Sequence, residues 1–357
     1  MTKKDLSFFK DKKILITGHT GFKGSWLSMI FIMAGADLTG YSLEPPTEPS
    51  LFKLAGLDNK MRSVIGDIRD REHLFKVFKE TNPEIVIHLA AQPIVRESYI
   101  NPVYTYETNV MGTVNICEAV RQCGTVRSFL NVTTDKVYLN REWVYGYRED
   151  EMLDGYDPYS NSKSCSELVT HSYINSFFND LGIAVSTARA GNVIGGGDFA
   201  KDRIIPDCVR AALNSEDIKV RNPYSIRPYQ HVLEPLNIYL TILKEQYQDK
   251  KYAGYYNVGP EDKDCIPTGE LVSLFCDKWN KEKDAQLKWI NESDMGPHEA
   301  KFLKLDCSKI KSVFGWKPVW DIEKAIEMTV RWSKAYCDNK DIVCEMSSEI
   351  KEFFKWK

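Results

Sequence analysis

The chain has 357 residues, of which 43% are hydrophobic and 27% charged, and its formal net charge at pH 7 is -3. This length and composition predict a globular protein with a large core, arranged as one big domain with a second lobe or as two domains. The small negative charge provides no basic field for nucleic acid or for an anionic membrane, so neither is expected as a partner.

The nine cysteines are an odd number without a CxxC pair, and they show no ligand-like spacing with the six histidines. This indicates a reducing cytoplasm and no structural metal. Residues 1–13 are polar and charged and lack the apolar core of a signal peptide. The longest apolar run, residues 26–36, is too short to cross a bilayer and predicts a buried helix.

The first motif joins a predicted strand to that helix. Residues 14–16 are apolar, and Gly18, Gly21 and Gly24 follow at a three-residue spacing. In such a unit the glycines permit a tight turn, a close approach of backbone to a diphosphate, and close packing of helix on strand. The motif therefore predicts a bound dinucleotide, with ordinary turn glycines as the alternative.

The second predicted strand, residues 37–43, should end near the adenosine ribose of that dinucleotide. The acid expected at this strand end is missing. Ser42 stands in its place, Glu44 follows two residues later, and no Arg or Lys lies close enough to suggest a 2′-phosphate site. This pattern favours NAD over NADP.

The chain continues as alternating strands and helices. Further strands are expected at residues 61–65, 84–92, 126–133 and 185–189, with helices at 71–79, 101–122 and 158–179. The alternation predicts an α/β fold with a doubly wound parallel sheet of the Rossmann type and right-handed crossovers. His88, inside an almost wholly apolar strand, is expected to be a core histidine.

Two polar stretches beyond the first strands are candidates for chemistry. Tyr159 and Lys163 are four residues apart, which places them on one helical face. The ammonium is expected to lower the pKa of the phenol from its usual value of about 10. Thr134 follows a strand, at the edge where open α/β sheets bind ligands, and is expected to bond the same substrate oxygen.

Together these motifs resemble the extended short-chain dehydrogenase/reductase family over nearly the whole chain. The matching pieces are Gly18-x-x-Gly21-x-x-Gly24, Asp67-Ile68, Leu89-Ala90-Ala91, Asn109, Tyr159-x-x-x-Lys163 and Tyr256-Asn257-Val258-Gly259. Thr134-Asp135-Lys136 stands where the sugar-nucleotide 4,6-dehydratases of that family that act on dTDP-glucose carry Thr-Asp-Glu. The lysine variant is similar to those that act on CDP-glucose.

The resemblance implies that the chain binds NAD and converts CDP-D-glucose to CDP-4-keto-6-deoxy-D-glucose and water, early in a deoxysugar pathway such as that of lipopolysaccharide O-antigens. The cofactor residues it implies are Gly18, Gly21, Phe22, Lys23, Gly24, Asp67, Ile68, Leu89, Ala90, Ala91, Asn109, Tyr159, Lys163 and Arg189.

The catalytic roles also come from the resemblance. Tyr159, with Lys163 and Thr134, would remove the C4 hydroxyl proton while the C4 hydride passes to NAD, and Asp135 would protonate the departing C6 hydroxyl. Lys136 is either the base at C5, which requires a lowered pKa, or a stabiliser of the enolate. A structural ion pair is the third alternative for Lys136.

The expected division of the chain is a Rossmann domain at 1–190, with return segments near 230–260, and a smaller α/β lobe for the sugar nucleotide at 191–357. Residues 191–198 are glycine-rich and are expected to form a flexible crossing. By resemblance, Arg227 holds the diphosphate. The other substrate residues implied are Asn192, Arg203, Arg221 and His231, while residues 297–300 either reach the substrate or begin a helix.

The resemblance implies a homodimer, or a homotetramer, built through the helices at 101–122 and 158–179. One alternative is a related enzyme, either an epimerase or a dehydratase acting on GDP-mannose or dTDP-glucose. Asp135 and Lys136 argue against an epimerase, which has no use for an acid and a base beside the tyrosine. A second alternative is a sensor or scaffold that binds NAD without turnover, which would not need Tyr159.

Overall fold

The computed structural model describes residues 1–281, 286–292 and 302–356. Its centre is a seven-stranded sheet in the order β11-β6-β5-β4-β1-β2-β3, in which every neighbouring pair is parallel. The strands are β1 (Lys13–Thr17), β2 (Asp37–Ser42), β3 (Arg62–Ile65), β4 (Ile85–His88), β5 (Ser128–Val132), β6 (Ala184–Ala190) and β11 (Tyr255–Val258). The predicted doubly wound α/β fold is confirmed.

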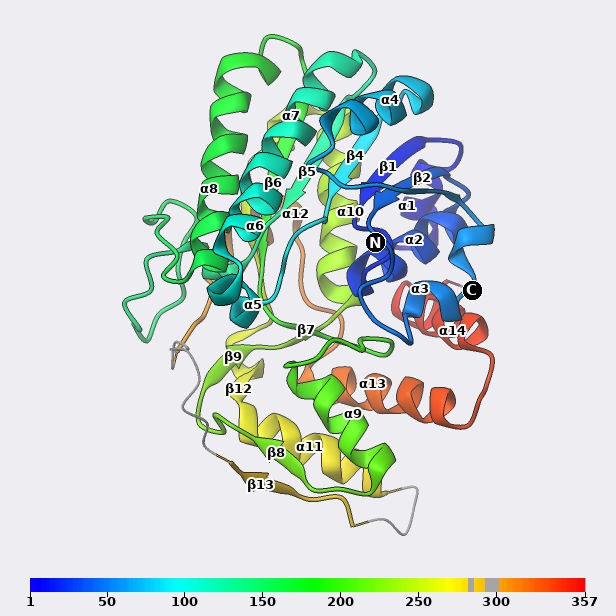
Figure 1. The fold of residues 1–357 in the computed structure, drawn as a ribbon, viewed down its shortest axis with the longest axis vertical. Helices are drawn as coiled ribbons and strands as arrows, with labels where there is room; N and C mark the ends of the chain where they lie inside the picture. Colours follow the sequence, from blue (N-terminus) through cyan, green and yellow to red (C-terminus); the bar gives the residue numbers. More distant parts are fainter. Residues whose placement is uncertain (282–285, 293–301, 357) are drawn as a thin grey trace.

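Helices cover both faces of this sheet (Figure 1). The helices on one face are α4 (Arg71–Thr81), α7 (Gly112–Cys123) and α8 (Pro158–Tyr173), and those on the other are α2 (Phe22–Ala34) and α10 (Leu233–Gln248). Successive residues of a strand face opposite sides, so Ile14 and Ile16 pack on the α2 side and Leu15 on the α4 side. Two-sided burial explains why the strands are nearly all apolar.

Helix α2 is buried around most of its circumference, from Gly24 to Phe31, because a second helix packs outside it. That outer helix is α14 (Ile342–Phe353), and its apolar side joins the same core as α2. The two chain ends meet nearby, where the Lys3 ammonium lies 5.9 Å from the Trp356 ring centroid. The C-terminal helix therefore belongs to the layer that covers the central sheet.

The helical run expected at 101–122 is divided into α6 (Pro102–Tyr106), a π-helical turn (Glu107–Met111) and α7. Strand β4 ends four residues before the predicted end. Its chain leaves the sheet there, because the N–H groups of Leu89 and Ala90 both donate to the Thr17 hydroxyl at 3.2 Å. The small helices of this part are α1 (Lys3–Leu6), α3 (Leu51–Leu54) and α5 (Val95–Ile100).

A smaller lobe with its own apolar core lies at one end of the sheet (Figure 1). It contains α9 (Ile204–Asn214), α11 (Thr268–Asn280) and α13 (Ile322–Cys337), while α12 (Ser308–Phe314) packs on β11. Three strand pairs complete it: β7 (Val193–Ile194) with β10 (Gln230–His231), β9 (Ile226–Pro228) with β12 (Cys265–Pro267), and β8 (Ile218–Val220) with β13 (Trp289–Asn291).

The glycine-rich crossing at 191–198 is not the flexible linker that was predicted. Gly195, Gly196 and Gly197 are buried, and the Trp26 indole donates to the Gly196 carbonyl at 3.0 Å. A Cβ at Gly196 would lie 2.0 Å from the Trp332 ring, and Gly197 has a φ of +84°. Close packing of the two lobes, rather than mobility, accounts for these glycines.

Candidate active site

The glycine loop forms the floor of the candidate site, between β1 and α2. Gly18 has a φ of +78°, and a Cβ there would lie 2.8 Å from the Ala90 nitrogen; a Cβ at Gly24 would lie 2.1 Å from the Gly18 oxygen. Both glycines are therefore required by the fold. At Gly21 a Cβ would meet only the Gly18 oxygen, at 3.5 Å. Nothing in the protein's packing requires glycine at that position.

This loop fits the dinucleotide predicted from the sequence. Gly21 caps α2, so the first N–H groups of this 13-residue helix have no acceptor within the helix. Such groups bind diphosphates, and a side chain at Gly21 would occupy the approach. Leu89, Ala90 and Ala91 are partly exposed beside the loop, at the carboxyl end of β4. The structure thus brings these predicted cofactor residues together.

Asn109 supports this cradle from behind. Its amide accepts from Gln92 N–H at 2.8 Å and donates to the Gln92 carbonyl at 3.0 Å and to the Ser162 hydroxyl at 2.9 Å. Both N–H bonds of the buried amide are thereby used. Asn109 thereby fixes the segment after β4 against α8, and its predicted contact with the cofactor stays a prediction.

Asp67 and Ile68 follow β3, on the other side of the loop. The Asp67 carboxylate is paired with the Arg69 guanidinium at 2.7 Å, and the Tyr41 hydroxyl donates to the Asp67 carbonyl at 2.9 Å. Ile68 is buried against α7, where a Cβ at Gly112 would lie 2.5 Å from its Cδ1. The role predicted for Asp67 at the adenine stays a prediction.

Tyr159 and Lys163 lie on the buried face of α8, as their spacing predicts. The helix begins at Pro158 because Asp157 caps it, accepting from Ser160 N–H at 3.0 Å. Tyr159 is hydrogen-bonded to Thr134, and the Lys163 ammonium donates to the Val132 carbonyl at 3.4 Å. The helix face is therefore joined to the end of β5.

Burial dominates the acidity of the phenol. It raises the pKa of Tyr159 to about 12, against the lowering effects of the Thr134 hydrogen bond and the Arg203 charge. Burial also lowers the pKa of Lys163 to about 8. The expectation that Lys163 lowers the phenol pKa is thus not met by the protein alone, because the loss of water around the ring outweighs the nearby cations.

Asp135 and Lys136 form the turn that follows β5, in which Thr134 caps the 3₁₀ segment η4 (Asp135–Val137). One Asp135 carboxylate oxygen accepts from the Thr134 hydroxyl at 3.0 Å and lies 3.4 Å from the Lys136 ammonium. The other is buried and without a hydrogen-bond partner in the described structure. It would lie 3.0 Å from a Cβ at Gly191, so it faces the crossing segment.

Two further cationic groups, Lys23 and Arg203, lie near this acid and lysine. Burial and the neighbouring charge of Arg203 lower the pKa of Lys23, at the start of α2, to about 8. Lys23 is also within electrostatic range of Asp135, Lys136 and Lys163. Arg203 is paired with Asp198 at 2.9 Å. Phe22, the residue before Lys23, packs on the crossing segment, since its Cζ would be 3.3 Å from a Cβ at Gly195.

The remaining substrate candidates lie further along the lobe. Arg227 is buried on β9. The next residue, Pro228, and the Asp135 carboxylate both lie beside Gly191, so this part of β9 is close to the catalytic turn. Asn192 accepts from Gln230 N–H through its backbone carbonyl at 3.1 Å. Arg221 is paired with Asp202 at 3.0 Å on the outer side. Residues 297–300 lie outside the described structure.

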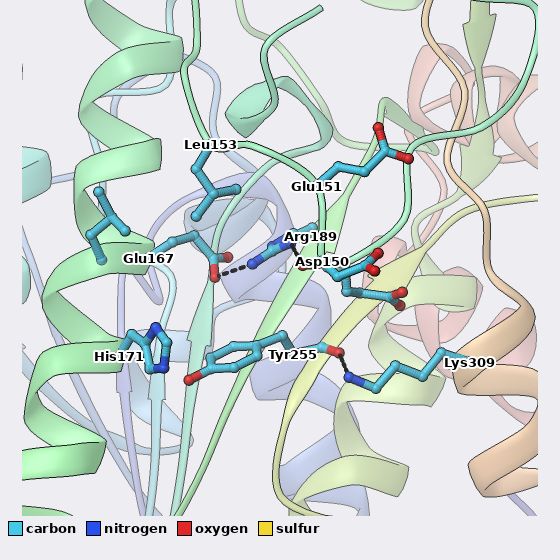
Figure 2. A pocket seen from close by; sticks show the side chains of 10 residues that line it. Asp150, Glu151, Leu153, Glu167, His171, Arg189, Tyr255 and Lys309 are labelled. Carbon is cyan, nitrogen blue, oxygen red and sulfur yellow. Dashed lines mark hydrogen bonds and ion pairs between the residues drawn. The ribbon is translucent and has the colours of Figure 1, made fainter.

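Arg189 does not lie in the cofactor cradle, contrary to its prediction. Its buried guanidinium is paired with Glu167 at 3.0 Å and donates to the Tyr138 hydroxyl at 2.8 Å and the Glu149 carbonyl at 3.0 Å. It lines a separate pocket of about 440 Å³ with His171, Tyr255 and Lys309 (Figure 2). The Arg189 side chain holds β6 to α8 and lies at this pocket rather than at the glycine loop.

His231 is also misassigned by the sequence prediction. The ring is fully buried, its Nδ1 accepts from Leu233 N–H at 3.3 Å, and its Nε2 lies 2.8 Å from a Glu349 carboxylate oxygen. Trp26 and Trp320 pack edge-on against it. His231 therefore joins the C-terminal helix to β10 and presents no group to a substrate.

Two acids of the site region were not predicted from the sequence: Asp198 beside Arg203, and Glu167 beside Lys163. Glu167 had a signal, because it stands one helical turn beyond Lys163 on α8. Within the described ranges, no group of three or more His, Cys, Asp or Glu side chains is placed to hold a metal ion. The same part of the chain contains no helix long and apolar enough to span a membrane.

Known proteins resemble this chain over nearly its whole length. The profile of a protein family described as GDP-mannose 4,6 dehydratase matches residues 15–329. A CDP-glucose 4,6-dehydratase of Salmonella typhimurium is 47% identical over 355 residues, which cover 98% of this chain and 98% of that protein.

Solved structures share the fold. A UDP-glucose 4-epimerase of Thermotoga maritima, crystallised with UDP-glucose, superposes with a TM-score of 0.77 at 20% identity, over 91% of this chain and 99% of that one. A dTDP-glucose 4,6-dehydratase of Bacillus anthracis in complex with NAD superposes with a TM-score of 0.73 at 21% identity, over 92% and 99%.

Proposed function

The chain belongs to the GDP-mannose 4,6-dehydratase family, a branch of the extended short-chain dehydrogenases/reductases, and from that premise we propose that it converts CDP-D-glucose to CDP-4-keto-6-deoxy-D-glucose and water. It is an NAD-dependent hydro-lyase. The observation that carries the proposal is the 47% identity to CDP-glucose 4,6-dehydratase over 98% of both chains. The gathering of Tyr159, Thr134, Asp135 and Lys136 at one sheet edge supports it.

The first step takes place at C4 of the glucose. Tyr159 removes the C4 hydroxyl proton, Thr134 orients that hydroxyl, and Lys163 stabilises the phenolate. NAD, when bound on the glycine loop, supplies the hydride acceptor at C4 and the hydride donor at C6, and its cationic ring favours the phenolate. Since burial raises the pKa of Tyr159 to about 12, the phenolate depends on those cations.

The second step is the loss of water across C5 and C6. The C4 ketone acidifies the C5 proton, and Lys136 removes it as the base. Asp135 protonates the departing C6 hydroxyl, for which its unpartnered carboxylate oxygen is available. Both roles require that the proton of this pair lies on Asp135. The Lys136 nitrogen is 3.4 Å from that carboxylate, so transfer of its proton leaves a neutral amine to take the C5 proton and an acid to protonate the C6 hydroxyl.

The diphosphate of the sugar nucleotide is held by arginine. Arg227 and Arg203 supply guanidinium groups, which match the paired oxygens of a diphosphate. Asn192 would lie near the diphosphate, and Arg221 would lie towards the nucleoside. These assignments extend the proposal from the site to the substrate.

The substrate is tested by incubating the purified protein with CDP-, dTDP-, UDP- and GDP-activated hexoses and following the alkaline ultraviolet absorbance of the keto product. We expect a product from CDP-glucose. A product from GDP-mannose or dTDP-glucose alone would establish one of the related dehydratases instead. The absence of product from every hexose, with NAD bound, would establish a non-catalytic NAD-binding protein.

The role of Lys136 is tested with two variants. If Lys136 is the base, both Lys136→Ala and Lys136→Arg should lower kcat by about 10² to 10⁴, because the arginine guanidinium stays protonated. An active Lys136→Arg with an inactive Lys136→Ala would identify a cation that stabilises the enolate. Parental kcat in both variants would leave Lys136 as a structural partner of Asp135.

We also propose that two copies associate through a face on α6 and α8 and that the dimer works in the cytoplasm. Exposed apolar side chains gather on this face, where the Tyr106 hydroxyl joins α6 to Asn161 of α8 at 3.0 Å. On α6 and α8 they are Val103, Tyr106 and Leu168; Tyr99 and Ile100 on α5, Met111 in the π-helical turn after α6 and Phe177 in the π-helical turn after α8 (Ile174–Phe178) are exposed on the adjoining elements. An apolar patch of this kind favours a self-complementary interface between identical chains.

A further inference from the structure

Glu167 continues the catalytic face of α8 by one more turn. Tyr159, Lys163 and Glu167 follow one another at four-residue spacing and are all buried. The Glu167 carboxylate accepts from the Thr133 hydroxyl at 2.5 Å, the Thr187 hydroxyl at 2.7 Å and the Arg189 guanidinium at 3.0 Å. A carboxylate this buried is stable only because these donors and the Arg189 charge replace water.

The hydrogen bond from Thr133 gives this carboxylate a route into the active site. Thr133 directly precedes Thr134, Asp135 and Lys136, and its own N–H donates to the Ala188 carbonyl at 2.9 Å. Its hydroxyl is thus one of the side-chain links that tie this turn to α8, together with the Ser164 hydroxyl, which donates to the Val137 carbonyl at 2.7 Å, and the Lys163 ammonium on the Val132 carbonyl. Among these links, the Thr133 hydroxyl is the one that reaches Glu167, so through it Glu167 helps to hold that turn against the helix that carries Tyr159.

Glu167 also acts on Lys163 through charge. Burial lowers the pKa of Lys163 to about 8, and Glu167 opposes this shift. The other titratable groups around Lys163 are Tyr159 on α8, His88 on β4 and Lys23 on α2, and the Arg189 guanidinium on β6 pairs with Glu167 itself at 3.0 Å. His88 is neutral because burial lowers its pKa to about 3, and Lys23 repels an ammonium. The negative charge that favours a protonated Lys163 therefore comes from Glu167.

We propose that Glu167 is a positioning residue for the dehydration, which fixes the Thr134–Asp135–Lys136 turn against the Tyr159–Lys163 face and keeps Lys163 protonated. The inference rests on the function proposed above. It differs from a purely structural role, since a buried ion pair that served only stability would leave turnover unchanged once the protein is folded.

Two matched variants separate these roles. Thr133→Val and Thr187→Val each remove one hydroxyl donor from the same carboxylate with little change in shape, but only Thr133 adjoins the catalytic turn. We expect similar losses of melting temperature in both. The kcat of Thr133→Val should fall at least about tenfold at unchanged KM, because small displacements of reacting groups are costly. Thr187→Val should stay within about twofold of the parent, and Thr133→Ser should restore kcat.

The charge is tested with Glu167→Gln through the pH dependence of kcat. Because the reaction requires protonated Lys163, the kcat of the parent should fall above about pH 8. In Glu167→Gln the pH at which kcat begins to fall should be lower by about one pH unit. An unmoved limb would overturn the role in charge. If Glu167→Gln does not fold, the threonine pair still decides the role in positioning.

The parent enzyme separates the two proposals. A parent that converts no nucleotide hexose refutes the proposed function. A parent that converts CDP-glucose, with a Thr133→Val variant of equal kcat, refutes this inference alone.

Discussion

Some of the residues buried between the sheet and its helices are polar, and the chain supplies hydrogen-bond partners for them. His88 is the clearest example, as its Nδ1 lies 2.7 Å from the Thr17 hydroxyl and its Nε2 lies 3.5 Å from the Thr113 hydroxyl. Both nitrogens are satisfied by hydroxyl groups, which can donate or accept, so the neutral ring is stable in the core. His88 is a core histidine, as its apolar strand predicts.

The burial of His88 makes stability depend on pH. Its pKa is lowered to about 3 by burial and by Lys163, whereas the unfolded chain has a value near 6.5. The unfolded state therefore binds the extra proton first, and this residue lowers the free energy of unfolding as pH falls below 6.5, by about 1.4 kcal/mol per pH unit. Urea unfolding of the parent and of His88→Gln should show a shallower decline in the variant. Equal slopes between pH 6.5 and 5 would contradict the assignment.

Arg189 and His231 show why some single residues escape prediction. The partner of His231 is Glu349, more than a hundred positions away, and the partner of Arg189 is on a preceding helix. Nothing in the local pattern reveals that these charges are already used. A lone basic residue in a sequence therefore resembles a ligand-binding residue until the fold supplies its partner.

At the scale of elements, the strand and helix predictions succeed because their signals are local. The apolar run at 14–16, the glycine spacing and the four-residue step from Tyr159 to Lys163 each fix a short segment, and β1, α2 and α8 follow. The crossing at 191–198 fails for the opposite reason. Its glycines are required by Trp332 and Leu51, which approach from distant parts of the chain.

The glycine loop makes a prediction that separates folding from binding. Gly24→Ala should lower the free energy of unfolding by roughly 3 kcal/mol, because its Cβ would overlap the Gly18 oxygen. Gly21→Ala should change that free energy by no more than about 1 kcal/mol, since the φ of Gly21 is -78° and the position is open.

Binding should show the reverse order. Calorimetric titration with NAD should give an affinity for Gly21→Ala that is weaker by about tenfold or more, equal to 1.4 kcal/mol. A Gly21→Ala variant that binds NAD like the parent would remove the loop from the cofactor site. The Gly24 variant serves as the control for instability.

For the whole molecule, the two lobes are joined through buried contacts and the exposed apolar face lies on α6 and α8. Charges placed there should prevent association. We expect the double variant Val103→Glu/Leu168→Glu to shift the mass measured by light scattering from dimer to monomer. The desolvation of two carboxylates in an apolar interface is the reason.

Leu213 on α9 is the matched control, since it is about as exposed as Leu168 but lies on the smaller lobe. Leu213→Glu should leave the mass unchanged. A dimer that survives the double variant on α6 and α8 would place the subunit contact elsewhere.

The last strand of the central sheet has a consequence for how the molecule is made. Strand β11 and the covering helices α10 and α14 come from late in the chain, although they complete a layer begun by the first residues. On the ribosome, a nascent chain ending near residue 190 has β6 as an unpaired edge and one face of its sheet partly uncovered. The central sheet is thus completed only after residue 258 has been synthesised, and its covering layer only after residue 353; until then the open edge and the uncovered face are exposed to aggregation.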